Sequence, residues 1–245
     1  MIHKQKFKLN ILIWITLFSI AMGLLECAVV IYLREIYYPE GFAFPLKSIE
    51  GNIALTEILR EAATLIMLVS IGILAGKNFY ERFAYFILSF AIWDISYYIF
   101  LKILIGWPES LMTWDILFLI PAPWVGPVIA PVILSILMTV FALLIIYFNQ
   151  FREVAIKRLD WILLILGSVI VIVSFIWDYM VFMLEQFSIP EVLSLTNRNT
   201  VLAYSTNYIP EQFVWWPFIL GSLIISSAIF AFYKRNLMRH DTRPR

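Results

Sequence analysis

Long apolar runs dominate the chain, and only short polar clusters separate them. An α-helix rises about 1.5 Å per residue, so about 20 apolar residues cross the ~30 Å hydrocarbon core of a bilayer. About six runs reach that length, over residues 9–33, 55–75, 83–105, 127–149, 161–184 and 217–233. Only 14% of the residues are charged, against about a quarter in soluble domains. We therefore predict an all-α polytopic membrane bundle that forms a single transmembrane domain over residues 1–245.

The residue types present favour few cofactor chemistries. Cys27 is the single cysteine and lies inside the first apolar run, so neither a disulfide framework nor a cysteine metal site is expected. Both histidines, His3 and His240, lie outside the runs, which disfavours imidazole-bound haem or zinc within the membrane. The formal net charge of +1 gives no indication of a nucleic-acid partner. We therefore predict no cofactor, no metal and no nucleic acid.

Lysine and arginine are unevenly distributed among the intervals between the runs, and in short loops they remain on the cytoplasmic side. With the N-terminus inside, five of the 18 lie outside or in the outer ends of spans: Arg34, Lys47, Arg60, Lys102 and Arg198. The remaining 13 are cytoplasmic: Lys4, Lys6, Lys8, Lys77, Arg82, Arg152, Lys157, Arg158, Lys234, Arg235, Arg239, Arg243 and Arg245. We predict a multi-pass protein of the cell inner (cytoplasmic) membrane with both termini in the cytoplasm. Compact loops and the lack of an Asn-x-Ser/Thr sequon fit a prokaryotic membrane.

The interval between the third and fourth runs is too apolar for a plain loop and reads GWPESLMTWDILFLIPAPWVGP. Its chain-breaking residues include Pro121, Pro123, Gly126 and Pro127. Proline removes a backbone donor and ends helices, so this stretch is not expected to cross the membrane as one regular helix. We predict a re-entrant or interfacial element over about residues 107–126 on the outer side. A full span here would move the basic residues of the next interval outside, against the charge distribution.

Acidic residues occur inside the apolar runs at a similar predicted depth, near the middle of a span or in its outer third. They are Glu26, Glu57, Glu61, Asp94 and Asp178. A charge near the bilayer centre costs at least ~2.5 kcal/mol, so such groups need partners or water. We expect an outward-facing, carboxylate-lined pocket that Asp115 of the proline-rich element can join. Carboxylates also suit a hard cation, but no aspartate-rich motif of fixed spacing favours a metal.

Helical spacing supplies a neighbour for two of these acids on the second run. Glu57, Arg60 and Glu61 occupy positions i, i+3 and i+4, so one guanidinium lies beside two carboxylates on one face. The group could position a polar headgroup. Equally, its ion pairs could only lock helices together.

The third run carries a polar stripe by the same spacing. Asp94, Tyr97 and Tyr98 share a face, and Lys102 follows about one turn later. Asp94 has no basic neighbour one turn away, and such an intramembrane carboxylate is a functional candidate. Lys102 could instead extend its ammonium group to the lipid headgroups.

The predicted roles follow from these positions, since a buried carboxyl can serve as a general acid or a proton carrier. The candidate catalytic residues are Asp94, Glu26 and Asp178. The candidate substrate-binding residues are Glu57, Arg60, Glu61, Tyr97, Tyr98, Lys102 and Asp115.

Three functions remain open on this basis. The first is a membrane-embedded enzyme or binding protein whose partners are membrane lipid and a lipid-like or amphipathic small molecule. The alternative is a proton- or cation-coupled transporter or channel subunit, for which so small a chain could form a homo-oligomer. A non-catalytic accessory membrane subunit, with the charges as helix-packing contacts, is the second alternative.

Overall fold

The computed structural model describes residues 2–47, 49, 51–120, 122–151, 154, 156–193 and 198–241, without the side chains of residues 2–8, 193, 198, 199 and 239–241. Several residues used above lie outside this part: Pro121, Arg152, Arg243 and Arg245, and the side chains of Lys4, Lys6, Lys8, His3, Arg198, Arg239 and His240.

In the described part, six helices are long and apolar enough to cross a membrane, which confirms the all-α multi-pass fold. They are α1 (Ile2–Tyr37), α2 (Gly51–Ala75), α3 (Phe79–Ile105), α4 (Ile129–Asn149), α5 (Arg158–Leu184) and α8 (Trp215–Asp241). The first and last helices continue past the predicted ends near 33 and 233, because hydrogen bonding continues where the side chains become polar. Tyr38 N, for example, still donates to Arg34 O at 2.7 Å.

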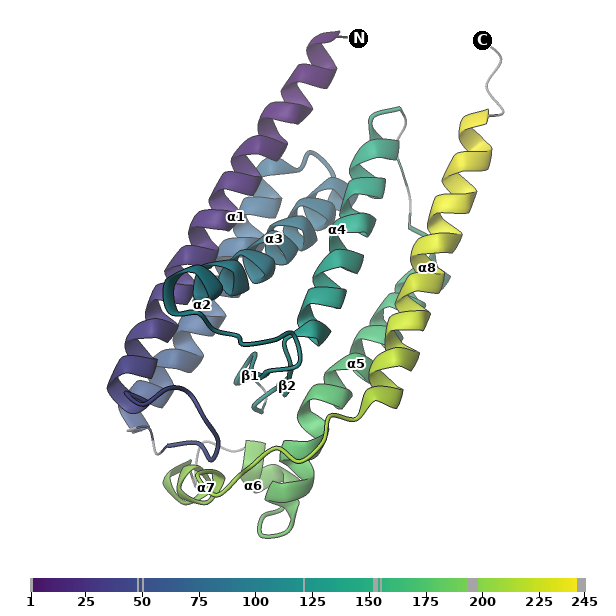
Figure 1. Cartoon of the computed structure of the whole chain (residues 1–245). Coiled ribbons are helices and arrows are strands. Elements are labelled where there is room, and N and C mark those ends of the chain that lie inside the picture. The colour runs from purple at the N-terminus through teal and green to yellow at the C-terminus, as the bar shows by residue number, and fades with distance from the viewer. Residues whose placement is uncertain are drawn as a thin grey trace.

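The start of α1 and the end of α8 lie at the same end of the bundle, which we name the terminal side (Figure 1). The opposite end, the loop side, carries two short helices, α6 (Ile189–Leu193) and α7 (Arg198–Ser205). No helix was predicted between residues 185 and 215, because both elements are too short to show an apolar repeat.

Small residues allow the helices to approach closely at two contacts. Helices α5 and α8 meet at a glycine pair, where a Cβ on Gly221 would lie 2.6 Å from the carbonyl oxygen of Gly167. Helices α1 and α3 meet at Gly23, where a Cβ would lie 2.7 Å from the Cβ of Ser96. Such contacts are typical of helix packing in membranes.

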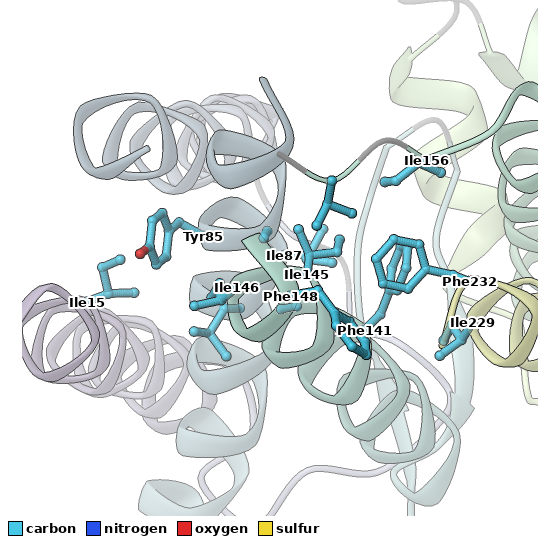
Figure 2. Close-up of a cluster of buried hydrophobic side chains, with 14 residues drawn as sticks. Ile15, Tyr85, Ile87, Phe141, Ile145, Ile146, Phe148, Ile156, Ile229 and Phe232 are labelled. Atoms are coloured by element: carbon cyan, nitrogen blue, oxygen red, sulfur yellow. The ribbon is translucent and has the colours of Figure 1, made fainter. Parts of the chain in front are cut away.

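The terminal half of the bundle contains one cluster of buried apolar side chains, here called the terminal core. Its residues come from α1, α3, α4, α8 and the connection between α4 and α5. Figure 2 shows it between the helices, with Ile15, Tyr85, Ile87, Phe141, Ile145, Ile146, Phe148, Ile156, Ile229 and Phe232 labelled. Phe141 packs edge-on against Phe232, with ring centroids 5.4 Å apart. At the rim, Asp160 of α5 forms an ion pair with Arg235 of α8.

The proline-rich segment folds as a hairpin instead of a span. Its strands, β1 (Trp114–Ile116) and β2 (Val125–Pro127), are antiparallel, with Asp115 opposite Gly126. The hairpin is buried, since Asp115 is only 2% exposed and a Cβ on Gly126 would lie 2.9 Å from the ring of Phe175. The predicted break in regular helix is therefore present, whereas the strand pairing was not predicted.

Candidate functional site

A cavity of about 230 Å³ lies in the loop half of the bundle. Its walls come from α1, α2, α3 and the segment that contains the hairpin, and the connection between α1 and α2 contributes Phe42 and Lys47. Tyr179 of α5 and Leu202 of α7 close another side. The cavity therefore draws on elements that are far apart in the sequence.

One wall of the cavity carries a three-residue ion-pair group. Arg60 of α2 forms an ion pair with Glu26 of α1, and its Nε donates to Glu57 Oε2 at 2.8 Å. The Arg60 Nη2 atom also lies 2.7 Å from the same Glu57 oxygen. One guanidinium thus compensates two carboxylates and links α1 to α2.

A second charged group surrounds Asp115 of β1. Arg34 Nη2 donates to Asp115 Oδ1 at 3.3 Å, and the Tyr98 hydroxyl donates to Asp115 Oδ2 at 3.2 Å. The Arg34 guanidinium carbon lies 3.7 Å from the centroid of the Trp107 ring and 4.7 Å from that of Phe42, within the range of cation–π attraction. Burial raises the pKa of Asp115 to about 6, against the lowering effect of Arg34.

Two further carboxylates line the cavity without an ionic partner. Asp94 Oδ2 accepts a hydrogen bond from Ser135 Oγ of α4 at 2.7 Å. Both carboxylate oxygens of Glu61 accept from the backbone N–H of Leu119, at 3.1 and 3.0 Å. Among the residues that the structure describes, neither acid lies within ion-pair distance of a cation.

Two buried hydrogen-bond donors of the cavity residues have no partner. Three buried side-chain atoms in the described part of the chain lack one: Arg34 Nη1, Trp93 Nε1 and Ser222 Oγ. The first two belong to residues that line the cavity, and Trp93 is only 6% exposed. A buried donor left unpaired costs about 1–3 kcal/mol, so such a group indicates a missing water or ligand.

The structure brings most of the predicted site residues together. The cavity is lined by Glu26, Glu57, Arg60, Glu61, Asp94, Tyr97, Tyr98 and Asp115. Asp178 and Lys102 are not among the residues that line it.

These two residues have other contacts. Asp178 Oδ2 accepts a hydrogen bond from the Tyr208 hydroxyl at 2.7 Å, which ties α5 to the segment before α8. The next residue, Tyr179, faces the cavity instead, since consecutive helical positions point about 100° apart. Lys102 is exposed, and its Nζ donates to the carbonyl oxygens of Gly106 at 3.0 Å and Pro108 at 2.8 Å beyond the end of α3.

Three polar residues of the cavity region were not predicted from the sequence as site residues. Arg34 was counted only as a charge outside the membrane, although it follows Glu26 and Val30 at i+8 and i+4 on one helix face. Trp93 and Ser135 gave no signal, because a tryptophan or a serine in an apolar run is ordinary. Their importance depends on contacts between separate helices.

The chain matches no family model, no curated protein and no solved structure. Its function is therefore inferred from the side chains alone. Within the described residues, no group of three or more His, Cys, Asp or Glu side chains is arranged to hold a metal ion. What the cavity offers is ionic and hydrogen-bonding groups beside apolar surface.

Proposed function

We propose that this membrane protein binds a lipid-like, amphipathic small molecule in the loop-half cavity. The observation that carries the proposal is the mixed lining of the cavity. Charged groups of α1, α2, α3 and β1 lie beside many apolar side chains: Val30, Leu33, Leu46, Ile49, Ile116, Leu117, Phe118, Leu119 and Leu202. An amphipathic molecule complements both kinds of group, since ligand sites combine a few placed polar groups with apolar walls.

The charged groups suit binding because Arg60 and Arg34 are already fixed. Arg60 is held by two carboxylates, and Arg34 is held by Asp115 and the ring of Trp107. Groups that are ordered before the ligand arrives lose less side-chain entropy on binding. A headgroup would therefore meet a preorganised surface.

If the bound molecule is turned over, Asp94 is the acid or base that we propose for the reaction. Glu26 is engaged with Arg60, and Asp178 is bonded to Tyr208 away from the cavity. Asp94 keeps an oxygen, Oδ1, for which no hydrogen bond to the described residues is recorded. A proton-transferring carboxyl needs such access to its substrate.

Binding is favoured over transport by the packing of the terminal half. Transport needs access from both sides of the membrane in turn. In the described part of the terminal half, the aromatic and aliphatic side chains of the terminal core pack between α1, α3, α4 and α8 (Figure 2).

To test the binding proposal, the chain is purified in mild detergent and its retained amphiphiles are detected by native mass spectrometry. Ala54 lines the cavity, so Ala54→Phe narrows it, whereas Ala63→Phe makes the same change on an exposed face of the same helix. We expect the unchanged chain and Ala63→Phe to retain an amphiphile that Ala54→Phe loses. Equal retention by both variants would refute binding in this cavity.

We further propose that the protein lies in a prokaryotic cytoplasmic membrane, with the terminal side in the cytoplasm and the cavity toward the outside. The support is the position of most lysines and arginines, which stay on the cytoplasmic side of short loops. Cys27, the single cysteine, is fully buried, so an introduced cysteine can be labelled selectively. A membrane-impermeant maleimide added to intact cells should label Glu109→Cys and spare Gln150→Cys. The reverse pattern would invert the orientation.

A further inference from the structure

The charges of the cavity do not balance. Its five carboxylates are Glu26, Glu57, Glu61, Asp94 and Asp115, and its three cations are Arg34, Arg60 and Lys47. Arg60 is shared by two of the acids, and Arg34 pairs with Asp115. Glu61 and Asp94 therefore remain as the acids with spare capacity for a positive group.

The cavity residues also have hydrogen-bond donors without a partner. The excess of negative charge does not account for these donors. Arg34 Nη1 and Trp93 Nε1 are buried and have no partner within the described residues. Both are N–H groups, so an acceptor oxygen can satisfy them, and a phosphate or carboxylate oxygen does so with the added attraction of its charge. The cavity thus lacks both a positive donor and an acceptor.

Two of these unmet groups, Trp93 and Asp94, belong to α3, whereas Arg34 belongs to α1 and Glu61 to α2. Trp93 and Asp94 are adjacent on α3, and Tyr98, which bonds the Asp115 partner of Arg34, follows Asp94 by four residues, about 6 Å along the helix axis. A headgroup whose ammonium and oxyanion are joined by a short linker spans a distance of this order.

We propose that the cavity recognises a zwitterionic headgroup, with a primary ammonium at Asp94 and Glu61 and a phosphate or carboxylate at the free donors of Arg34 and Trp93. This inference rests on the proposed function, because it names the headgroup of the amphipathic ligand. The same chemistry occurs in a phosphatidylethanolamine lipid and in a water-soluble zwitterion such as O-phosphoethanolamine.

Related headgroups satisfy only part of the cavity. A trimethylammonium group has no N–H to donate to Asp94 or Glu61. An anionic glycerol headgroup adds negative charge beside carboxylates that already lack cations. Only a headgroup with both an ammonium and an oxyanion matches the donors and the acceptors at once.

The experiment compares three short-chain lipids with the same acyl chains, dihexanoyl phosphatidylethanolamine, phosphatidylcholine and phosphatidylglycerol, together with O-phosphoethanolamine. Binding to the full chain in detergent micelles is measured by isothermal titration calorimetry. We expect phosphatidylethanolamine to bind about tenfold tighter than the other two lipids, which corresponds to one charged hydrogen bond. The free headgroup is expected to bind more weakly than the lipid.

Three variants assign this preference to the cavity. Asp94→Asn should lower the affinity for phosphatidylethanolamine about tenfold and leave that for phosphatidylcholine unchanged. Trp93→Phe should weaken both lipids by a similar factor, since both carry the phosphate. Asp178→Asn removes an acid outside the cavity and should change neither affinity. If a variant fails to fold, the lipid preference of the unchanged chain still tests the headgroup inference.

Each outcome separates this inference from the proposed function. If the three lipids bind with equal affinity and Ala54→Phe abolishes their binding, the headgroup inference is overturned and the binding of an amphipathic ligand in the cavity is supported. Tightest binding of phosphatidylglycerol would also overturn the inference. Equal binding of O-phosphoethanolamine and its lipid would support the zwitterion and overturn the lipid-like ligand. Absence of all binding would overturn both.

Discussion

The terminal half and the loop half of the same helices bury their side chains in different ways. In the terminal half, aromatic and aliphatic groups pack against one another (Figure 2). Asp160 and Arg235 form an ion pair at the rim. In the loop half, the helices enclose a cavity with five carboxylates and two buried donors that have no partner. Both halves use α1 and α3, but the loop half adds the hairpin, the connection between α1 and α2, and α7.

This contrast indicates a division of labour, in which the terminal half stabilises the fold and the loop half binds the ligand. Unpaired donors and uncompensated carboxylates lower stability, and natural chains keep such features where function requires them. The packing of the terminal core can offset this loss of stability. We therefore expect substitutions in the terminal core to change mainly stability, and substitutions in the cavity to affect charge balance, pH dependence and binding.

The largest effect is expected for Arg60→Met, which removes the shared cation from Glu26 and Glu57. Breaking a buried ion pair leaves uncompensated charge and costs about 3–5 kcal/mol. We expect the free energy of unfolding to fall by about 4 kcal/mol, measured by denaturation in mixed micelles.

The control for this prediction replaces all three members of the group. Arg60→Met combined with Glu26→Gln and Glu57→Gln removes the charges together, so it should recover most of the lost stability. If the triple variant is as unstable as the single variant, the side chains matter for packing and not for charge.

Phe141→Ala tests the opposite half. Phe141 is buried against Phe232 and Phe83, so its truncation leaves a void in the terminal core. Such changes cost about 3–5 kcal/mol in soluble proteins. We expect about 3 kcal/mol, the lower end, because lipid provides less hydrophobic driving force than water.

Lipid binding by the Phe141→Ala variant distinguishes an effect on stability from an effect on binding. Phosphatidylethanolamine affinity of the Phe141→Ala variant should equal that of the unchanged chain under conditions where both are folded. A loss of affinity in the folded variant would show that the two halves are coupled and would contradict the division of labour.

Much of this architecture could be predicted from the sequence, because apolar length is a local property. The six spans follow from runs of residues that each cross a bilayer, and the break at the proline-rich segment follows from missing backbone donors. The i, i+3 spacing of Glu57 and Arg60 likewise gave a contact that lies within one helix.

The missed features depend on contacts between elements. Nothing local distinguishes Asp178, which bonds Tyr208, from Asp94, which lines the cavity. Their roles are set by the rotation of α5 and α3 about their axes, and an almost uniformly apolar helix carries little periodic signal for that rotation. Trp93 was unpredictable for a similar reason, since its unpaired N–H is visible only when all neighbours are known.

Asp115→Asn tests the pH dependence of the loop half. Burial raises the pKa of Asp115 to about 6, above the value near 3.8 expected in the unfolded chain. Folding therefore favours the protonated acid, and its contribution to stability is full below pH 4 and is lost as the pH rises to 6. The unchanged chain should lose about 2 kcal/mol over this range relative to the variant.

The measurement is denaturation in mixed micelles at several pH values between 4 and 7. Glu109→Gln changes an exposed acid of the same connection and should keep the slope of the unchanged chain. An identical slope in Asp115→Asn and the unchanged chain would exclude Asp115 as the group that titrates.

The smallest effect is expected for Tyr98→Phe, which removes one hydrogen bond of 3.2 Å to Asp115. A bond this long contributes no more than about 1 kcal/mol. The hydroxyl also lowers the pKa of Asp115, so its loss should move the upper end of the pH-dependent range above 6. Tyr97→Phe, a matched change at a neighbouring cavity residue with no recorded bond to Asp115, should leave that end in place. If both variants move the upper end of the pH-dependent range equally, the loss of any cavity hydroxyl has this effect and the bond to Asp115 is not its cause. The loop half would then respond to the polarity of the cavity as a whole.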